Sequence, residues 1–294
     1  MLLLTGATGM VGSALLERLL AEGRQVRCLV RDPRRLGPRR VRVQIALGDL
    51  TDPPSFRNAL RGVGTVVHLA ATIRDQPRGS IEEVDGLATW RMVEAAQRQG
   101  VERFLFFSVL GASTHDRTRL RRAKALAEQA VSEADLASIV FAPSIIYAPG
   151  DPWLRMLERL ALLPVMPVSG RARAVYQPIW ADDVAACVSS ALLAEGLPRR
   201  ARFELAGPET LSHGEIIRIV LRAVGHPRPL LHVPTPVVSR ALRTWERLAG
   251  QGTFATWDEA ELMEVSMTSP RGAADAEALG VRPQRMAAVL GAAR

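Results

Sequence analysis

The sequence is short of lysine, cysteine and tyrosine. Lys124 is its one lysine, and all the other basic residues, of 38 in total, are arginines. The two cysteines, Cys28 and Cys187, lie in apolar segments without metal-ligand spacing, so we expect no metal site and a reducing, cytoplasmic setting. The apolar run at the N-terminus is a few residues long and has no basic segment before it. We therefore expect neither a signal peptide nor a membrane-spanning helix there.

The overall composition is that of a soluble globular protein, because 48% of the residues are hydrophobic and 23% are charged. The net charge of +8 suits a phosphorylated ligand or an anionic membrane surface. The arginines are scattered along the chain and are not gathered on one helix, so we expect no nucleic acid as a partner. A chain of 294 residues is long enough for one large α/β unit with a smaller second lobe.

The first twenty residues combine an apolar run, a glycine-rich turn and a helical pattern. Gly6, Gly9 and Gly12 follow the apolar residues 1–4 and lead into a helical apolar pattern. In this context glycines let backbone N–H groups and the positive end of a helix approach a pyrophosphate. The alternative is a tight turn that binds no ligand. The residues expected to bind a dinucleotide here are Thr5, Gly6, Thr8, Gly9, Met10, Val11 and Gly12.

Strand and helix patterns alternate through the first half of the chain. Strand-like runs occur at 26–30, 41–46, 65–69, 104–108 and 137–142, and helical patterns at 54–61, 81–99 and 119–133. This alternation predicts the α/β class and a Rossmann-type, doubly wound parallel sheet, whose ligands bind where the strand order reverses. Beyond residue 142 prolines interrupt the pattern, with helices expected at 152–161, 182–195 and 212–224. We expect a single unit over 1–294, in which a core (about 1–142) is interleaved with a small C-terminal substrate lobe (about 143–294).

The residues that follow the second strand bear on the choice of cofactor. An acidic residue at this point binds both ribose hydroxyls of NAD, whereas an arginine holds the 2′-phosphate of NADP. Arg31 occupies this position, and Arg34 or Arg35 is expected to support it. NADP(H) is therefore favoured, while Asp32 keeps NAD(H) as an alternative.

Two further strand ends suit the same ligand. Asp49 follows the third strand, where its carboxylate is expected to accept the adenine amino group while Leu50 packs against the ring. Ala70 and Ala71 follow the fourth strand, where small side chains allow the sugar–phosphate backbone to lie close. Together with the N-terminal turn, these segments make a consistent set.

Taken together, the motifs resemble those of the short-chain dehydrogenase/reductase superfamily in its extended or atypical branch, which includes epimerases and dehydratases. The matching segments are TGATGMVG at 5–12, VRD at 30–32, GDL at 48–50, HLAA at 68–71, APSIIYAPGD at 142–151, QPIWADDVA at 177–185 and FELAGPETLSHGEI at 203–216. The resemblance covers most of the chain and adds Pro143 and Ile146 to the expected cofactor-binding residues. It is strongest to the group of the complex I nucleotide-binding accessory subunit, followed by the NmrA-like redox-sensing regulators.

The resemblance also identifies a catalytic region, where this chain departs from the family. Family members use a serine, a tyrosine and a lysine, the last two spaced Y-x-x-x-K on one helix. Lys124 matches the lysine, which binds the nicotinamide ribose, and Ser108 is the candidate serine, although it can also simply satisfy a strand-end carbonyl. The tyrosine position holds Leu120. Loss of this general base should lower ordinary alcohol–ketone turnover by roughly 10²–10⁴.

Two hypotheses for function remain open at this point. The first is a reductase or isomerase with another proton donor, acting on an apolar carbonyl or quinone-like compound. The second is a structural or redox-sensing protein that binds NAD(P)H without chemistry. Ala142 and Ala148 stand where the family often has arginine and glycine, and both argue against a sugar-nucleotide substrate.

The second lobe offers weaker signals. An apolar wall that suits a hydrophobic substrate, or else the lobe's own core, is predicted from Tyr147, Trp153, Met156 and Trp180. Asp182 and Asp183 are expected to cap a helix. A basic helix predicted at 236–249 either packs on its own domain or contacts a protein partner or a membrane surface.

Overall fold

The computed structural model describes the chain except for residues 74, 76–78, 235, 239, 241–261 and 293–294. A seven-stranded sheet forms its centre, in the order β11-β6-β5-β4-β1-β2-β3, and every neighbouring pair is parallel. Its strands are β1 (Leu2–Thr5), β2 (Val26–Val30), β3 (Gln44–Leu47), β4 (Thr65–His68), β5 (Arg103–Phe107), β6 (Ala137–Pro143) and β11 (Arg200–Leu205). The strand order runs outward in both directions from β1 and β4, so the expected doubly wound topology is confirmed.

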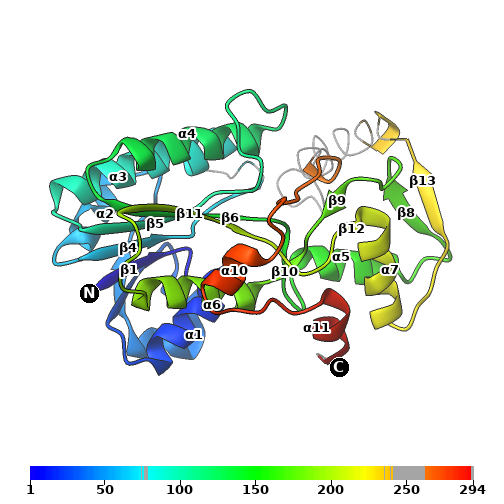
Figure 1. The fold of residues 1–294 in the computed structure, drawn as a ribbon, viewed down its shortest axis with the longest axis horizontal. Coiled ribbons are helices and arrows are strands. Elements are labelled where there is room, and N and C mark those ends of the chain that lie inside the picture. The colour runs from blue at the N-terminus through cyan, green and yellow to red at the C-terminus, as the bar shows by residue number, and fades with distance from the viewer. Residues whose placement is uncertain (74, 76–78, 235, 239, 241–261, 293–294) are drawn as a thin grey trace.

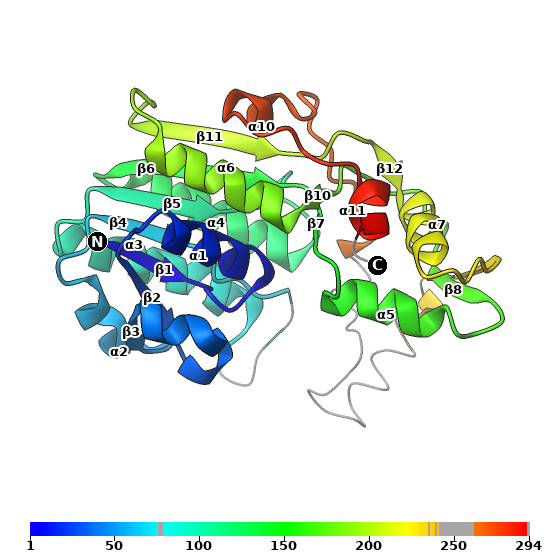
Figure 2. The same ribbon diagram turned by 90° about the horizontal axis from the view of Figure 1, so that it is seen from below.

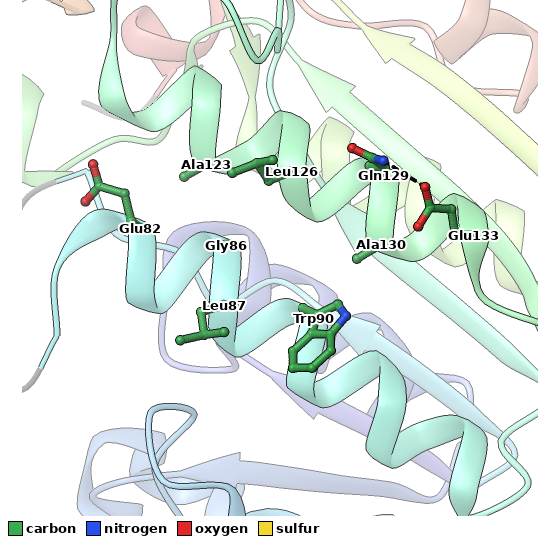
Figure 3. A pocket seen from close by; sticks show the side chains of 9 residues that line it. All are labelled: Glu82, Gly86, Leu87, Trp90, Ala123, Leu126, Gln129, Ala130 and Glu133. Atoms are coloured by element: carbon green, nitrogen blue, oxygen red, sulfur yellow. Dashed lines mark hydrogen bonds between the residues drawn. The ribbon is translucent and has the colours of Figure 1, made fainter.

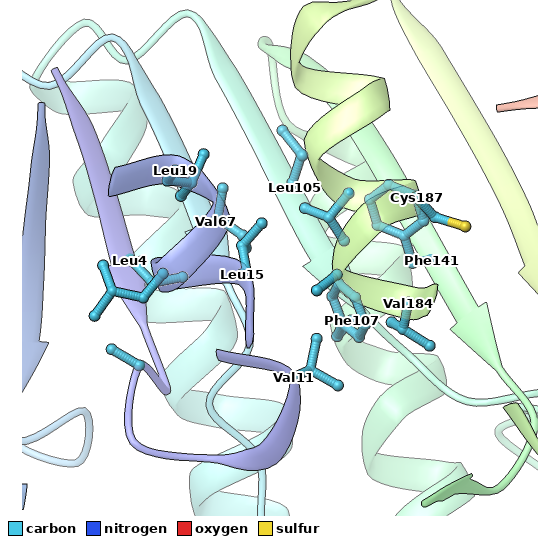
Figure 4. Close-up of a cluster of buried hydrophobic side chains, with 14 of the residues drawn as sticks. Leu4, Val11, Leu15, Leu19, Val67, Leu105, Phe107, Phe141, Val184 and Cys187 are labelled. Carbon is cyan, nitrogen blue, oxygen red and sulfur yellow. The ribbon is translucent and has the colours of Figure 1, made fainter. Parts of the chain in front are cut away.

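Helices cover both faces of this sheet (Figure 1). One face carries α1 (Met10–Ala21) and α6 (Ala181–Leu193), and the other carries α2 (Pro53–Phe56), the 3₁₀ helix η2 (Arg57–Leu60), the π-helix η3 (Glu82–Leu87), α3 (Ala88–Arg98) and α4 (Arg119–Glu133). The apolar pattern of α1 explains its place, because Val11, Leu15 and Leu19 are all buried. Figure 4 shows Leu15 and Leu19 near Leu4 of β1 and Val67 of β4, and Val11 near Phe107 of β5.

The C-terminal lobe consists of short elements beside the sheet (Figure 2). Three two-stranded ladders pair β10 (Ile179–Trp180) with β7 (Ile146–Tyr147), β12 (Leu211–Ser212) with β9 (Val175–Tyr176), and β13 (Leu230–Val233) with β8 (Met166–Ser169). The helices described in this lobe are α5 (Pro152–Leu160), α7 (His213–Ala223), α10 (Ala274–Ala278) and α11 (Met286–Ala292). The chain leaves the central sheet after β6 and returns to it at β11, and α10 then packs against β11.

Two local features differ from the sequence prediction, and a third cannot be compared with it. A 3₁₀ segment, η1 (Pro33–Arg42), occupies the predicted start of the third strand, so β3 begins at Gln44. The helix predicted at 81–99 is a π-helix in its first part. Most of the basic helix predicted at 236–249 lies outside the described residues. Of the helices that the structure describes, none has both the length and the apolar character needed to span a membrane.

Candidate dinucleotide-binding site

A crevice of about 400 Å³ lies at the carboxyl ends of the first four strands. It is centred where β1 separates β2 from β4, which is the point at which the strand order reverses. Its lining comes from five stretches of chain: residues 5–9, 29–32 with Arg35, 48–51, 69–72, and Val84. The crevice therefore includes Thr5, Gly6, Thr8, Gly9, Arg31, Asp49, Leu50, Ala70 and Ala71 of the predicted cofactor residues.

The glycine turn at the base of the crevice requires residues without side chains. Gly6 has a φ of 72°, and a Cβ placed on it would lie 2.7 Å from the backbone nitrogen of Ala70. A Cβ on Gly12 would lie 2.1 Å from the carbonyl oxygen of Gly6. Gly9 is the N-cap of α1, and no side chain caps that end, so the first N–H groups of the helix are available to an anion.

The charged residues at the end of β2 include both signs. Arg31, Asp32 and Arg35 line the crevice, whereas Arg34 does not. The guanidinium of Arg34 instead donates to Asp32, from Nε to Oδ1 over 3.0 Å and from Nη2 to Oδ2 over 3.2 Å. These hydrogen bonds to Arg34 lower the pKa of Asp32. The contact of Arg34 with the cofactor stays a prediction. Of the two arginines that the sequence offers as support for Arg31, it is Arg35 that lines the crevice.

Asp49 carries a buried oxygen without a hydrogen-bond partner. Its Oδ1 accepts from the backbone N–H and the hydroxyl of Thr51, at 3.1 and 2.9 Å. Its Oδ2 is buried and accepts no hydrogen bond from the residues that the structure describes. Because a buried oxygen of this kind is stabilised by a donor, the site fits an amino group such as that of adenine. The residues present thus fit a dinucleotide.

His68 supports the base of the crevice from below. It is fully buried, with Nδ1 2.9 Å from the hydroxyl of Thr5 and Nε2 3.2 Å from that of Thr89. Burial lowers its pKa to about 3, so the ring is neutral at physiological pH. Thr5 in turn accepts from the backbone N–H of Ala70, which ties β1 to the loop after β4.

Lys124 is buried on α4 beside a carboxylate that the sequence analysis did not select. Its Nζ lies 2.8 Å from Oδ1 of Asp85 and donates to the carbonyl oxygen of Phe107 over 2.8 Å. The two side chains are 4% and 0% exposed. Lys124 does not line the crevice described above, and its contact with a nicotinamide ribose stays a prediction. Asp85 was detectable as an acid on the buried face of the predicted helix at 81–99, four residues after Ile81 and four before Thr89.

The remaining predicted site residues lie around the ends of β5 and β6. Leu120 is 8% exposed and belongs to an apolar cluster with Val109 and Tyr147. Ser108 is 5% exposed, and its hydroxyl has no hydrogen-bond partner within the described part of the chain. The carbonyl oxygen of Pro143 accepts the N–H of Leu110, while Ile146 pairs with Ile179 in the β7–β10 ladder, and neither residue lines the crevice. Met10, Val11 and Gly12 lie in the first turn of α1.

Of the residues predicted as an apolar wall, Tyr147 is buried and Trp153, Met156 and Trp180 are half-buried. They belong to or pack against an apolar cluster that also includes Leu120 from the first half of the chain, so both interpretations of these residues stay open. Asp182 and Asp183 lie in the first turn of α6, where their negative charge interacts favourably with the helix dipole as expected, but the capping part of the prediction is wrong, because the N-cap is Trp180. Asp182 forms an ion pair of 2.6 Å with Arg18 of α1, and Asp183 accepts the N–H of Gln284.

A second hollow lies on the outer face of the molecule, between α4 and the pair η3–α3 (Figure 3). It has a volume of about 370 Å³ and a mainly apolar lining that includes Leu87, Trp90 and Leu126. Gly86 and Ala123 face each other there, which shows how closely η3 packs against α4. The residues that line it are distinct from those of the crevice.

Comparisons with known proteins agree with this geometry. A family model described as NAD(P)H-binding matches residues 6–150. Sterol demethylase protein B of Methylococcus capsulatus is 31% identical over 262 residues, which cover 79% of this chain and 77% of that protein. The mitochondrial NADH dehydrogenase (ubiquinone) 1 alpha subcomplex subunit 9 of Arabidopsis thaliana is 27% identical over 244 residues. That match covers 79% of this chain but only 60% of the plant protein.

The fold is shared with solved structures of low sequence identity. A nucleoside-diphosphate-sugar epimerase from Staphylococcus aureus superposes with a TM-score of 0.76 over 99% of both chains, at 19% identity. A Thermus thermophilus UDP-glucose 4-epimerase in complex with NAD gives a TM-score of 0.73 over 99% of this chain and 96% of that one, at 21% identity. At this level of identity the likeness establishes the architecture alone.

Proposed function

Because this chain belongs to the atypical short-chain dehydrogenase/reductases, an NAD(P)H-binding family, we propose that it binds NADP(H) without the family's tyrosine–lysine proton relay. The observation that carries the proposal is the pairing of Lys124 with buried Asp85, beside Leu120 at the tyrosine position. A structural or redox-sensing role requires only that the protein binds the nucleotide, without chemistry on it.

The proposed binding mode uses the residues that line the crevice. Backbone N–H groups at the start of α1 would hold the diphosphate, with Gly6 and Gly9 allowing its close approach. Asp49 would accept the adenine amino group through its unpartnered Oδ2. The proposed contacts of Thr8 with the diphosphate, of Leu50 with the adenine ring and of Ala71 with the sugar–phosphate backbone rest on the same lining.

The proposed preference for NADP(H) over NAD(H) rests on charge at the end of β2. Arg31 and Arg35 line the crevice, and a guanidinium binds a 2′-phosphate in a bidentate manner. Asp32 is the residue that would favour NAD, but Arg34 already donates two hydrogen bonds to its carboxylate. The balance of charge therefore favours the phosphorylated cofactor.

The loss of the relay is argued from chemistry at α4. A relay needs a phenol whose proton affinity is lowered by a neighbouring ammonium group. Here Leu120 has no ionisable group, and the charge of Lys124 is compensated by Asp85. Bound NADPH would supply a hydride, but the proton that must accompany it has no donor at the usual position.

Two measurements on the wild-type protein test this proposal. Fluorescence titration should give a Kd for NADPH at least about tenfold below that for NADH, because one added charged contact contributes about 1.4 kcal/mol or more. NADPH oxidation should stay at its background rate with a panel of aldehydes, ketones and quinones. A Kd ratio near one would contradict the cofactor preference, and carbonyl-dependent oxidation would contradict the loss of chemistry.

Ser108 favours a second candidate function, the reduction of an apolar carbonyl compound. Its hydroxyl is buried and unpartnered at the end of β5, so it is available to hold a carbonyl oxygen. The apolar cluster around Leu120 and the likeness to sterol demethylase protein B support an apolar substrate. Carbonyl-dependent turnover that Ser108→Ala abolishes, with an unchanged Kd for NADPH, would establish this function.

We also propose that the protein is cytoplasmic and has a protein partner. Cys28 and Cys187 are both buried and unpaired, which supports the cytoplasm as the setting. Likeness to a complex I subunit supports a protein partner for this chain. Fractionation of cells expressing the tagged protein, with copurification at low and high salt, tests both points.

A further inference from the structure

The carboxylate of Asp85 binds two different parts of the molecule. Its Oδ1 lies 2.8 Å from the ammonium group of Lys124 on α4. Its Oδ2 accepts the backbone N–H of Thr72 over 2.9 Å, and Thr72 lines the dinucleotide crevice. One side chain thus connects the loop after β4 with the helix that carries the family's catalytic lysine.

The surrounding structure holds this carboxylate in place. Asp85 is fully buried in η3, whose close packing against α4 is seen at Gly86 and Ala123 (Figure 3). Lys124 has a second acceptor in the carbonyl oxygen of Phe107, and its Nζ lies 5.0 Å from the ring centre of Phe106. A short π-helix of this kind is often found at functional sites.

Resting on the proposed NADPH binding, we propose that Asp85 is a positioning residue for the dinucleotide. It fixes the crevice loop through the N–H of Thr72, and Lys124 is the counter-charge that keeps its carboxylate in that place. In this arrangement Lys124 acts on nucleotide affinity through Asp85 and the loop, and not through a contact with the nicotinamide ribose.

Variants that remove one or both charges, but keep the shape of the side chains, can test this proposal. A buried charge left without its partner is unfavourable and moves the groups around it, whereas a neutral pair of similar shape is tolerated. In Asp85→Asn the amide oxygen can still accept the N–H of Thr72, but the ammonium of Lys124 loses its counter-charge. In Lys124→Met the carboxylate of Asp85 loses its counter-charge. The double variant removes both charges and keeps the hydrogen bond to the loop.

The test is the Kd for NADPH, by fluorescence titration, in these three variants and a matched control. Glu83→Gln is the control, because Glu83 lies on the same π-helix and its Oε2 accepts a backbone N–H, that of Ser80, over 2.8 Å, but it is exposed. We expect the Kd to rise about tenfold or more in each single variant. We expect the double variant and the control to stay within about threefold of the wild type.

Two results would overturn the proposal. A double variant that binds NADPH as weakly as Lys124→Met would mean that the ammonium itself contacts the nucleotide. Unchanged Kd values in all variants, with a lower Tm alone, would mean that the pair only stabilises the fold. If the single variants do not fold, the Kd of the double variant decides between these outcomes. A wild-type protein that does not bind NADPH would instead contradict the proposed function.

Discussion

The proposed adenine half of the site and the half that corresponds to the family's catalytic region use their polar groups in opposite ways. In the adenine half, at the ends of β1 to β3, Arg31 and Arg35 line the crevice and an oxygen of Asp49 lacks a partner. In the catalytic half, at the end of β5 and on α4, Lys124 is paired with Asp85 inside the protein. The tyrosine position there holds Leu120, within an apolar cluster.

This difference separates recognition of a nucleotide from chemistry on it. Polar groups that face a crevice without partners retain their capacity to bind a ligand, whereas groups already paired inside the protein contribute to the fold. Arg121, next to Leu120, follows the same trend, because its guanidinium donates to the carbonyl oxygen of Ser266 over 2.7 Å. This contrast supports the proposal that the nucleotide binds through the crevice at the ends of β1 to β3, while the paired charges on α4 mainly stabilise the fold.

The largest expected effect is the loss of stability on removing the ion pair between Lys124 and Asp85. Lys124→Met leaves Asp85 as an unpaired buried carboxylate, which should lower the free energy of unfolding by about 3–5 kcal/mol. Urea denaturation measures this change. The control is Arg98→Met, which removes an exposed ion pair with Glu94 on α3 and should change stability by less than about 1 kcal/mol. Equal losses of unfolding free energy in the two variants would mean that the Lys124–Asp85 ion pair stabilises the protein no more than an exposed pair does.

The next largest effect concerns the glycine turn at the base of the crevice. Gly12→Ala puts a methyl group 2.1 Å from the carbonyl oxygen of Gly6, so the turn must move away from its position at the start of α1. We expect the Kd for NADPH to rise by about 100-fold, equivalent to about 2.7 kcal/mol. Gly64→Ala is the control, because a Cβ at Gly64 meets no atom within 4 Å. Similar affinities for the two variants would show that the turn does not hold the diphosphate.

A smaller effect sharpens the account of cofactor choice. Arg31→Ala should raise the Kd for NADPH by about tenfold and that for NADH by less than about twofold, because only NADPH carries the 2′-phosphate. Arg35→Ala should act in the same direction. Arg34→Ala, which removes the partner of Asp32, should weaken NADPH binding less than either. Parallel losses for the two cofactors in Arg31→Ala would contradict the proposed preference.

The smallest expected effect is a pH dependence of stability from the base of the crevice. The unfolded chain protonates His68 near its ordinary pKa of 6.5, whereas the buried ring protonates only near pH 3. Between these values the unfolded state binds more protons, so stability falls as the pH decreases from about 6.5 toward 3. Buried His213, with its pKa lowered to about 4, contributes in the same direction.

The variant His68→Asn isolates the contribution of the first histidine. Between pH 7 and pH 5.5 it should lose less stability than the wild type does, by roughly 1 kcal/mol, because one titrating group is gone. This window lies above the titration of the carboxylates with lowered pKa values, such as Glu82 at about 2. Identical pH profiles for variant and wild type would mean that His68 is accessible to protons in the folded state.

Local pattern was sufficient for the central elements of the fold. The second strand at 26–30 and the helix at 119–133 were predicted with the bounds that the structure has, because each combines a strong apolar period with clear ends. The edge strands were less predictable. β3 is mostly exposed, and β11 alternates between exposed and half-buried residues until Leu205, so neither carries a buried apolar run.

Side-chain partners set the limit of prediction within the site. The glycine turn follows from local sequence, since its backbone conformation is a local property. The pairing of Lys124 with Asp85, by contrast, joins two helices and is a tertiary choice between several available charges. The sequence marked Lys124 as unusual, but its spacing gave no information on which carboxylate lies opposite.

The most direct test of the account is a crystal structure of the protein with NADPH bound. We predict that the diphosphate lies on the first turn of α1 and that Nζ of Lys124 remains on Asp85. The ribose hydroxyls of the nicotinamide half should then lie beyond hydrogen-bond distance of Nζ, which is about 3.2 Å. An ammonium group that has left Asp85 to bind those hydroxyls would contradict the account.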